Sequence, residues 1–302
     1  MRVASTQYHT TMNTALQQAS VRVENIMQKM AKGTALLVPS DDPITHVRLA
    51  RLSREEAALA QYRDNIGALD ARLRQNETLL DSMSSDMVDA RDLLLWAANG
   101  ANPGDDLVAM AGSLRTLAEG LFHTANSRDQ EGRYLFSGTL SSTATLAYDG
   151  TAAPGSRYTL QGNNGEQKVV VGNGITQTAN VTLDNMHDLL NRLDEAIVEL
   201  ESGAGANDPA VRAAVTAAMN QLDDTFDAVG TKIAGIGGAR NIIATLDANH
   251  ANVSLSNQQA AIDIGQLDYG DAAVKLNGYT SALQATQKAY AQVSKLSLFD
   301  VI

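Results

Sequence analysis

The sequence predicts a mainly α-helical protein: a long antiparallel helical bundle or coiled-coil rod with a small β-rich insertion. Three observations support this fold class. Apolar residues recur every seven positions over two long stretches, one in each half of the chain. Aromatic residues make up only 4% of a sequence rich in alanine and leucine, which suits closely packed helices. Between the two stretches, residues 139–182 lose the helical period and become rich in Thr, Gly, Asn and Val.

The longest predicted helix covers residues 44–98. Its heptad positions are all apolar: Leu52, Leu59, Ile66, Leu73, Leu80, Met87 and Leu94. From Leu59 on, the positions three residues later are also apolar except for Asn76, so one narrow stripe follows the helix. With a rise of about 1.5 Å per residue, the helix would be on the order of 80 Å long, which is too long for a compact domain. We therefore expect it to form the spine of the rod.

A first helix is predicted in front of this spine, ending at Gly33. The segment Ser40-Asp41-Asp42-Pro43 then starts the long helix. The residue before a proline avoids the helical region, so Asp42 is expected to be the N-cap and Pro43 the first helical residue. The same four residues are open to a second interpretation, a hinge between a terminal segment and the rod.

The rod helix is expected to stop at a turn over residues 99–104. Asp105 or Asp106 would then cap a shorter helix, and the short turn makes the two helices antiparallel neighbours. Residues 126–138 follow, predicted as a loop and a short strand bounded by glycine.

The β-rich insertion is predicted to contain a hairpin. Residues 157–161 and 167–171 are strand-like and flank the turn residues 162–165. The insertion is near the size at which independent stability becomes doubtful. Because helical spacing frames it on both sides, we expect a Gly/Ser linker to replace residues 140–181 without loss of the rod.

Helical spacing returns at Leu183 and resumes after a second Asp-Pro start at Asp208. Long helices from both halves flank one insertion, so the two ends are expected to return to each other and pack side by side. The predicted domains are terminal helices that pack together (1–40 and 255–302), a helical rod (41–138 and 183–254) and a small β-rich outer domain (139–182).

The composition argues against several classes of function. Without cysteine, the chain has no disulfide, zinc–thiolate site or thiol nucleophile, and its net charge of −11 gives no support for nucleic-acid binding. The five histidines share no metal-ligand spacing, and His250 on a heptad position is expected to be a packed core residue. The sequence contains no recognisable nucleophile–base pair. We therefore predict no catalytic residue, no cofactor and no metal site, and we expect that the protein is not an enzyme. No apolar run suits a membrane span or a cleaved signal peptide.

Four motifs occur together in the helical halves. They are the opening residues 1–6, the segment Pro39-Ser40-Asp41-Asp42-Pro43, residues 126–138 with the core Gly132-Arg133-Tyr134-Leu135-Phe136-Ser137-Gly138, and the ending over residues 283–299. In this combination the chain resembles the flagellin superfamily and, within it, the hook-associated family of the hook–filament junction. Flagellin itself usually continues differently after the paired aspartates, without Pro43, which favours the junction family over a filament subunit.

This resemblance implies a structural adaptor of the bacterial flagellum whose terminal helices line the inner tube. It implies type III export without a cleaved signal peptide and a secreted, extracellular location in the flagellum. The implied partners are the chain itself in a ring of subunits, the first hook-associated protein, flagellin and a flagellar export chaperone, with no nucleic acid and no membrane. Two alternatives stay open: a flagellin-type filament subunit and, from a different class, a secreted helical effector or coiled-coil protein.

The resemblance also places an assembly interface along the two terminal helices. Its expected residues are Tyr8, Met12, Ala19, Val23, Ile26, Met30, Tyr269, Leu276, Tyr279, Leu283, Tyr290, Val293, Leu298 and Phe299, with Ser40, Asp41, Asp42 and Pro43 as the hinge or cap.

Overall fold

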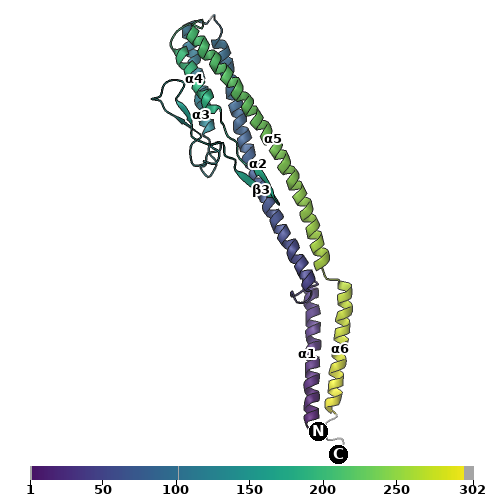
Figure 1. Ribbon diagram of the computed structural model, residues 1–302. Helices are drawn as coiled ribbons and strands as arrows, with labels where there is room; N and C mark the ends of the chain where they lie inside the picture. The colour runs from purple at the N-terminus through teal and green to yellow at the C-terminus, as the bar shows by residue number, and fades with distance from the viewer. Residues whose placement is uncertain (1, 101, 296–302) are drawn as a thin grey trace, which may run out of the picture. The chain divides into compact units, whose positions relative to one another are not determined.

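The computed structural model describes residues 2–100 and 102–295, with side chains between residues 6 and 292. It confirms a mainly helical chain with long antiparallel helices and a small insertion of two sheets (Figure 1). The helices are α1 (Arg2–Lys32), α2 (Pro43–Ala97), α3 (Gly104–Ala125), α4 (Met186–Glu201), α5 (Pro209–Gly265) and α6 (Tyr269–Lys295). The strands are β1 (Leu146–Tyr148), β2 (Tyr158–Leu160), β3 (Lys168–Gly172) and β4 (Ile175–Thr178).

The chain divides into two compact units, to which α2 and α5 both contribute. The terminal unit comprises the residues up to Leu59 and those from Ala251 onward, and the middle unit runs from Ala60 to His250. Within the middle unit α2 and α5 are antiparallel, as their ion pairs show. Arg63 Nε lies 2.9 Å from Asp247 Oδ1, whereas Arg91, further along α2, pairs at 2.8 Å with Asp223, which lies earlier in α5.

The predicted heptad stripe is the core-facing side of α2 in the middle unit. Leu80, Met87 and Leu94 are fully buried and Leu73 is 2% exposed. They belong to one apolar cluster with side chains of α3, α4 and α5. Asn76, the polar exception in the stripe, is also fully buried, and its amide has no hydrogen-bond partner among the described residues. An unpaired buried amide costs free energy, so this position is a weak point in the core.

Two long helices start as the Asp-Pro motif predicts. Asp42 Oδ1 accepts hydrogen bonds from the backbone N–H groups of Ile44 (3.0 Å) and Thr45 (3.1 Å). Asp208 Oδ1 accepts one from the N–H of Ala210 at 2.8 Å. Each aspartate thereby satisfies donors that the first helical turn leaves unpaired.

The predicted cap of α3 is wrong. The helix begins at Gly104, and Pro103 in the N-cap position makes no side-chain hydrogen bond. Asp105 and Asp106 lie within the first turn instead, where their charges favour the positive end of the helix dipole. The first helical residue packs closely on another loop, since a Cβ on Gly104 would lie 2.3 Å from the carbonyl oxygen of Gly203.

The predicted hairpin of the insertion is also wrong. Its two segments belong to different antiparallel sheets, one formed by β1 and β2 and the other by β3 and β4. The turn at residues 173–174 closes β3 on β4, with Gly174 at φ 71°, a backbone conformation that glycine adopts without strain. Gly162, in the expected turn, packs instead on Ser137, whose Cα would lie 2.8 Å from an added Cβ.

Residues 126–138 form turns rather than the expected short strand. Within the described residues, their ladder is limited to an isolated bridge between Arg128 and Tyr134. Gly138 adopts φ 69°, and a Cβ there would lie 2.0 Å from the carbonyl oxygen of Asn163. This close approach packs the segment against the insertion.

Asparagine side chains tie the first sheet to the helices. Asn126, at the end of α3, donates to the carbonyl of Leu146 and accepts from its N–H, both at 3.0 Å. Asn191 of α4 does the same with Tyr158, at 2.8 and 2.9 Å. Each side-chain amide makes both backbone hydrogen bonds of one strand residue, as a neighbouring strand would otherwise do.

The second sheet lies against α2 and α5. Asn65 Nδ2 donates to the carbonyl of Val170 at 2.8 Å, and His250 Nε2 lies 2.8 Å from that of Val171. His250, predicted to be a core residue, is half-buried, with its ring 5.6 Å from that of Tyr62. Val171 is fully buried in the same apolar cluster as the helices, so the insertion shares the core of the middle unit.

Candidate assembly interface

The two terminal helices, α1 and α6, pack side by side and antiparallel (Figure 1). Toward one end of the pair, His9 Nδ1 lies 3.2 Å from the hydroxyl oxygen of Tyr290. At the other end, the Tyr269 hydroxyl donates a hydrogen bond to the carbonyl of Met30 at 3.0 Å. The structure thus brings together helices from the two halves of the chain and forms a seam between them.

The interface residues expected from the sequence lie at different depths in this seam. Ile26 is 7% exposed, whereas Tyr8 and Tyr269 are 36% and 50% exposed. The half-buried members are Met12, Ala19, Val23, Met30, Leu276, Tyr279, Leu283 and Tyr290. Leu298, Phe299 and the side chain of Val293 lie outside the described residues.

Two contributors to the seam lie outside the list of expected interface residues. Ala272 is 1% exposed and lies on the apolar stripe of its helix, seven residues before Tyr279, as the heptad spacing predicts. His9 contacts Tyr290 edge to face, with 5.6 Å between ring centroids. No sequence pattern marks His9, because its partner comes from the other end of the chain.

Several large apolar side chains of the terminal unit remain exposed. Val21 and Met27 of α1 are 52% and 55% exposed, Leu255 of α5 is 69% exposed and Val274 of α6 is 72% exposed. A pair of helices cannot surround its own side chains, so part of each apolar surface stays in water. Large apolar side chains left exposed on a helix pair are candidates for a site of protein association.

The helical stretch that starts at Asp208-Pro209 is divided into two helices. Helix α5 ends at Gly265 and α6 begins at Tyr269. Asp268 caps α6, since its Oδ1 accepts hydrogen bonds from the N–H groups of Gly270 (2.8 Å) and Asp271 (3.1 Å). The sequence contains this signal, a glycine followed by a capping aspartate, but the continuous apolar spacing and the absence of proline concealed it.

The connection from α1 to α2 pairs with the connection from α5 to α6. The N–H of Ala35 donates to the carbonyl of Gly265 at 2.9 Å, and the N–H of Leu267 donates to that of Gly33 at 3.1 Å. We call these four residues the clasp. It fixes the end of α1 beside the start of α6, which sets the register of the seam.

Asp41, one of the predicted hinge residues, holds this connection in place. Its carboxylate accepts a hydrogen bond from the N–H of Leu37 at 3.1 Å and pairs with Lys29 Nζ at 3.0 Å. The hydrogen bond from Leu37, followed by that from Lys29, lowers the pKa of Asp41 below its usual 3.8. The carboxylate is therefore charged at neutral pH, and Ser40 beside it is exposed.

Asp42 and Pro43 act as a cap. The Thr45 hydroxyl donates to Asp42 Oδ2 at 2.7 Å, and this bond, followed by that from the Thr45 N–H, lowers the pKa of Asp42. Pro43 begins α2. The motif therefore gives the connection a defined conformation between the two helices.

Within the described parts of the chain, no group of three or more His, Asp or Glu side chains is placed to hold a metal ion. No described helix combines the length and the apolar character that crossing a membrane requires.

Comparison with known proteins gives a consistent result. Residues 3–141 match the family described as the bacterial flagellin N-terminal helical region. The chain is 26% identical to flagellar hook-associated protein 3 of Escherichia coli (strain K12) over 289 residues, 91% of each chain. It is 34% identical to a solved flagellar hook-associated protein from Vibrio parahaemolyticus, with a TM-score of 0.67, over 75% of this chain and 100% of that one.

A more distant structure shares the fold. The flagellar junction protein FlgL from Legionella pneumophila is 12% identical and superposes with a TM-score of 0.59, over 72% of this chain and 100% of that one.

Proposed function

The chain belongs to the family of flagellar hook-associated protein 3 (FlgL), structural proteins of the flagellar hook–filament junction rather than enzymes, and we propose that its paired terminal helices are the surface through which it assembles there. The observation that carries this proposal is the incomplete burial of α1 and α6. Within their described side chains, Ile26 and Ala272 are the only buried ones. Burial of apolar area stabilises by roughly 25 cal/mol per Å², so covering this pair with further helices is favourable.

Neighbouring copies of the chain are the first partners that we propose. Each copy presents the same helix pair, with Val21 and Met27 exposed on α1 and Val274 exposed on α6. Repeated contacts between two different faces of identical subunits close into a ring when the rotation allows it. Copies arranged in this way would cover one another's exposed apolar side chains.

The other partners follow from the position of the family between hook and filament. We propose that the first hook-associated protein contacts this chain on the hook side and that flagellin contacts it on the filament side. We also propose that the chain is exported unfolded through the flagellar type III apparatus, without a cleaved signal peptide and with a chaperone. The absence of cysteine supports this route, because no disulfide can hold the chain folded.

Carboxylates placed on the terminal helices test the proposal. Val274→Asp changes a side chain that is 72% exposed, and Leu283→Asp changes one that is half-buried in the seam. A carboxylate in an apolar interface costs several kcal/mol unless it is paired, so both variants should prevent junction assembly. In cells lacking the native copy, we expect hooks without filaments and flagellin released into the medium.

The matched control is Asn277→Asp, which adds a carboxylate at an exposed polar position of the same helix. It should support normal filaments. The thermal melt of Val274→Asp should equal that of the native protein, because the side chain is exposed in the monomer. Normal filaments and motility with both Val274→Asp and Leu283→Asp would rule out the α1–α6 pair as the assembly surface.

A further inference from the structure

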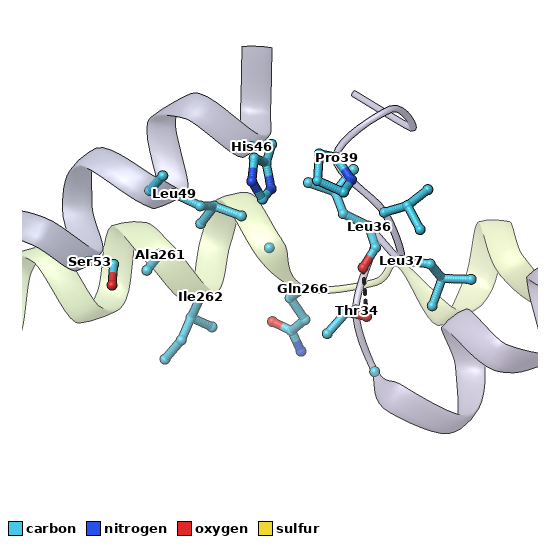
Figure 2. A pocket seen from close by; sticks show the side chains of 14 residues that line it. Thr34, Leu36, Leu37, Pro39, His46, Leu49, Ser53, Ala261, Ile262 and Gln266 are labelled. Atoms are coloured by element: carbon cyan, nitrogen blue, oxygen red, sulfur yellow. Dashed lines mark hydrogen bonds between the residues drawn. The ribbon is translucent and has the colours of Figure 1, made fainter. Parts of the chain in front are cut away.

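A groove lies beside the clasp, at the end of the helix pair where α1 stops and α6 starts. Its volume is about 720 Å³. Figure 2 shows its walls: the connection after α1 supplies Leu36 and Leu37, α2 supplies Leu49, and α5 supplies Ile262. All of these residues belong to the terminal unit.

The groove is lined mainly by apolar side chains, and His46, Ser53 and Gln266 are polar members of its lining. The Thr34 hydroxyl is occupied by a hydrogen bond to the carbonyl of Leu36 at 3.1 Å (Figure 2), and the clasp pairs the nearby backbone. Val38 and Ile262 line the groove and are 49% and 53% exposed. The chemistry that fits such a surface is a short apolar segment of a protein chain.

The chain contains one such segment outside the described structure. Residues 296–302 include Leu296, Leu298, Phe299, Val301 and Ile302, with Asp300 as the only charged side chain. His46 lines the groove and offers a ring nitrogen to which a carboxylate can bind.

The segment cannot reach the groove of its own chain. Helix α6 has 27 residues and starts beside the groove, so its far end lies about 40 Å away. Seven extended residues span at most about 25 Å. An occupied groove therefore requires the segment of another molecule.

We propose that residues 296–302 of one copy bind the apolar groove of the next, which makes the contact head to tail. The groove lies at one end of the α1–α6 pair, and the segment follows the other end of α6 in the sequence, so a single type of contact can repeat from subunit to subunit. This inference rests on the proposed assembly through the terminal helices, and it names the segment and the receiving surface.

Peptide binding to the full-length chain tests the inference. A fluorescein-labelled peptide of residues 293–302 is titrated with native protein and followed by fluorescence anisotropy. We expect saturable binding that weakens at least tenfold with Val38→Asp. Val38 is half exposed in a loop, so this variant should keep the native thermal melt. Ile262→Asp, which changes the α5 side of the groove, should weaken binding similarly.

Two controls separate the groove from the seam. Val274→Asp, on α6 away from the groove residues, should bind the peptide as native protein does, and a peptide carrying Phe299→Asp should bind at least tenfold more weakly. No saturable binding, or binding that Val38→Asp and Ile262→Asp leave unchanged, would overturn the proposal. Even with that outcome, a failure of Val274→Asp to assemble the junction would still support assembly through the terminal helices.

Discussion

Two helix pairs of this chain, α3 with α4 and α1 with α6, differ in how much of their apolar surface they bury. Helices α3 and α4 have 22 and 16 residues and bury six and seven side chains. Helices α1 and α6 are longer, with 31 and 27 residues, but each buries a single described side chain. Helices α3 and α4 belong to an apolar cluster that also includes α2, α5 and the insertion, whereas α1 and α6 pack mainly against each other. Burial here depends on the number of neighbours and not on helix length.

Removal of the insertion should have the largest effect on the middle unit. Replacing residues 140–181 with a Gly/Ser linker deletes Leu146 and Val171 from the core and leaves the Asn126 and Asn191 amides without their strand partners. Large buried side chains are worth about 2–5 kcal/mol each, so we expect a loss on the order of 5 kcal/mol, measured by urea unfolding. The sequence alone suggested that this replacement would be tolerated. An unfolding midpoint equal to that of the native chain would support that earlier expectation instead.

Truncation of one leucine in each unit tests the comparison directly. Leu73 is 2% exposed in the middle unit, whereas Leu283 is half-buried in the seam. Leu73→Ala should lower the free energy of unfolding by about 2–5 kcal/mol, and Leu283→Ala by less than about 1 kcal/mol in the monomer. Circular dichroism melts of verified monomers measure both. Equal losses for the two variants would mean that the terminal pair is as well packed as the core.

The smallest effect is expected at Asn76, and it has the opposite sign. The amide is fully buried without a described partner, so replacing it with an apolar side chain removes a desolvation cost. Asn76→Leu should raise the free energy of unfolding by about 1 kcal/mol, as measured by denaturant titration. Asn277→Leu, at an exposed position of α6, should change it by less than about 0.5 kcal/mol.

Asn76→Ala is a control for overpacking, because leucine is larger than alanine and can strain the core. If both Asn76→Leu and Asn76→Ala lower the unfolding free energy, then a bound water satisfies the amide in solution.

Local signals in the sequence predicted the helices of the rod. The heptad from Leu52 to Leu94 and the Asp-Pro starts depend on residues within one or two turns of each other. The structure places α2 at Pro43–Ala97, within a residue of the sequence prediction. The stripes on α1 and α6 were predictable for the same reason.

Non-local packing explains what the sequence did not reveal. Residues 162–165 have turn chemistry, but their position is decided by Ser137 and Gly138, which lie about 25 residues away. The clasp joins Gly33 to Leu267, and the groove beside it exists only once the two connections meet. Periodicity within one helix contains no information about such pairs, so the apolar stripes of α1 and α6 could be predicted but the groove could not.

The clasp also has a mechanical consequence. Its two hydrogen bonds join the residues that follow α1 to the residues that precede α6. Tension on either terminal helix is therefore shared with the other, because these bonds join the connection after α1 to the connection before α6. If such a chain is part of a rotating fibre, a force on one terminal helix would therefore be carried by both terminal helices together.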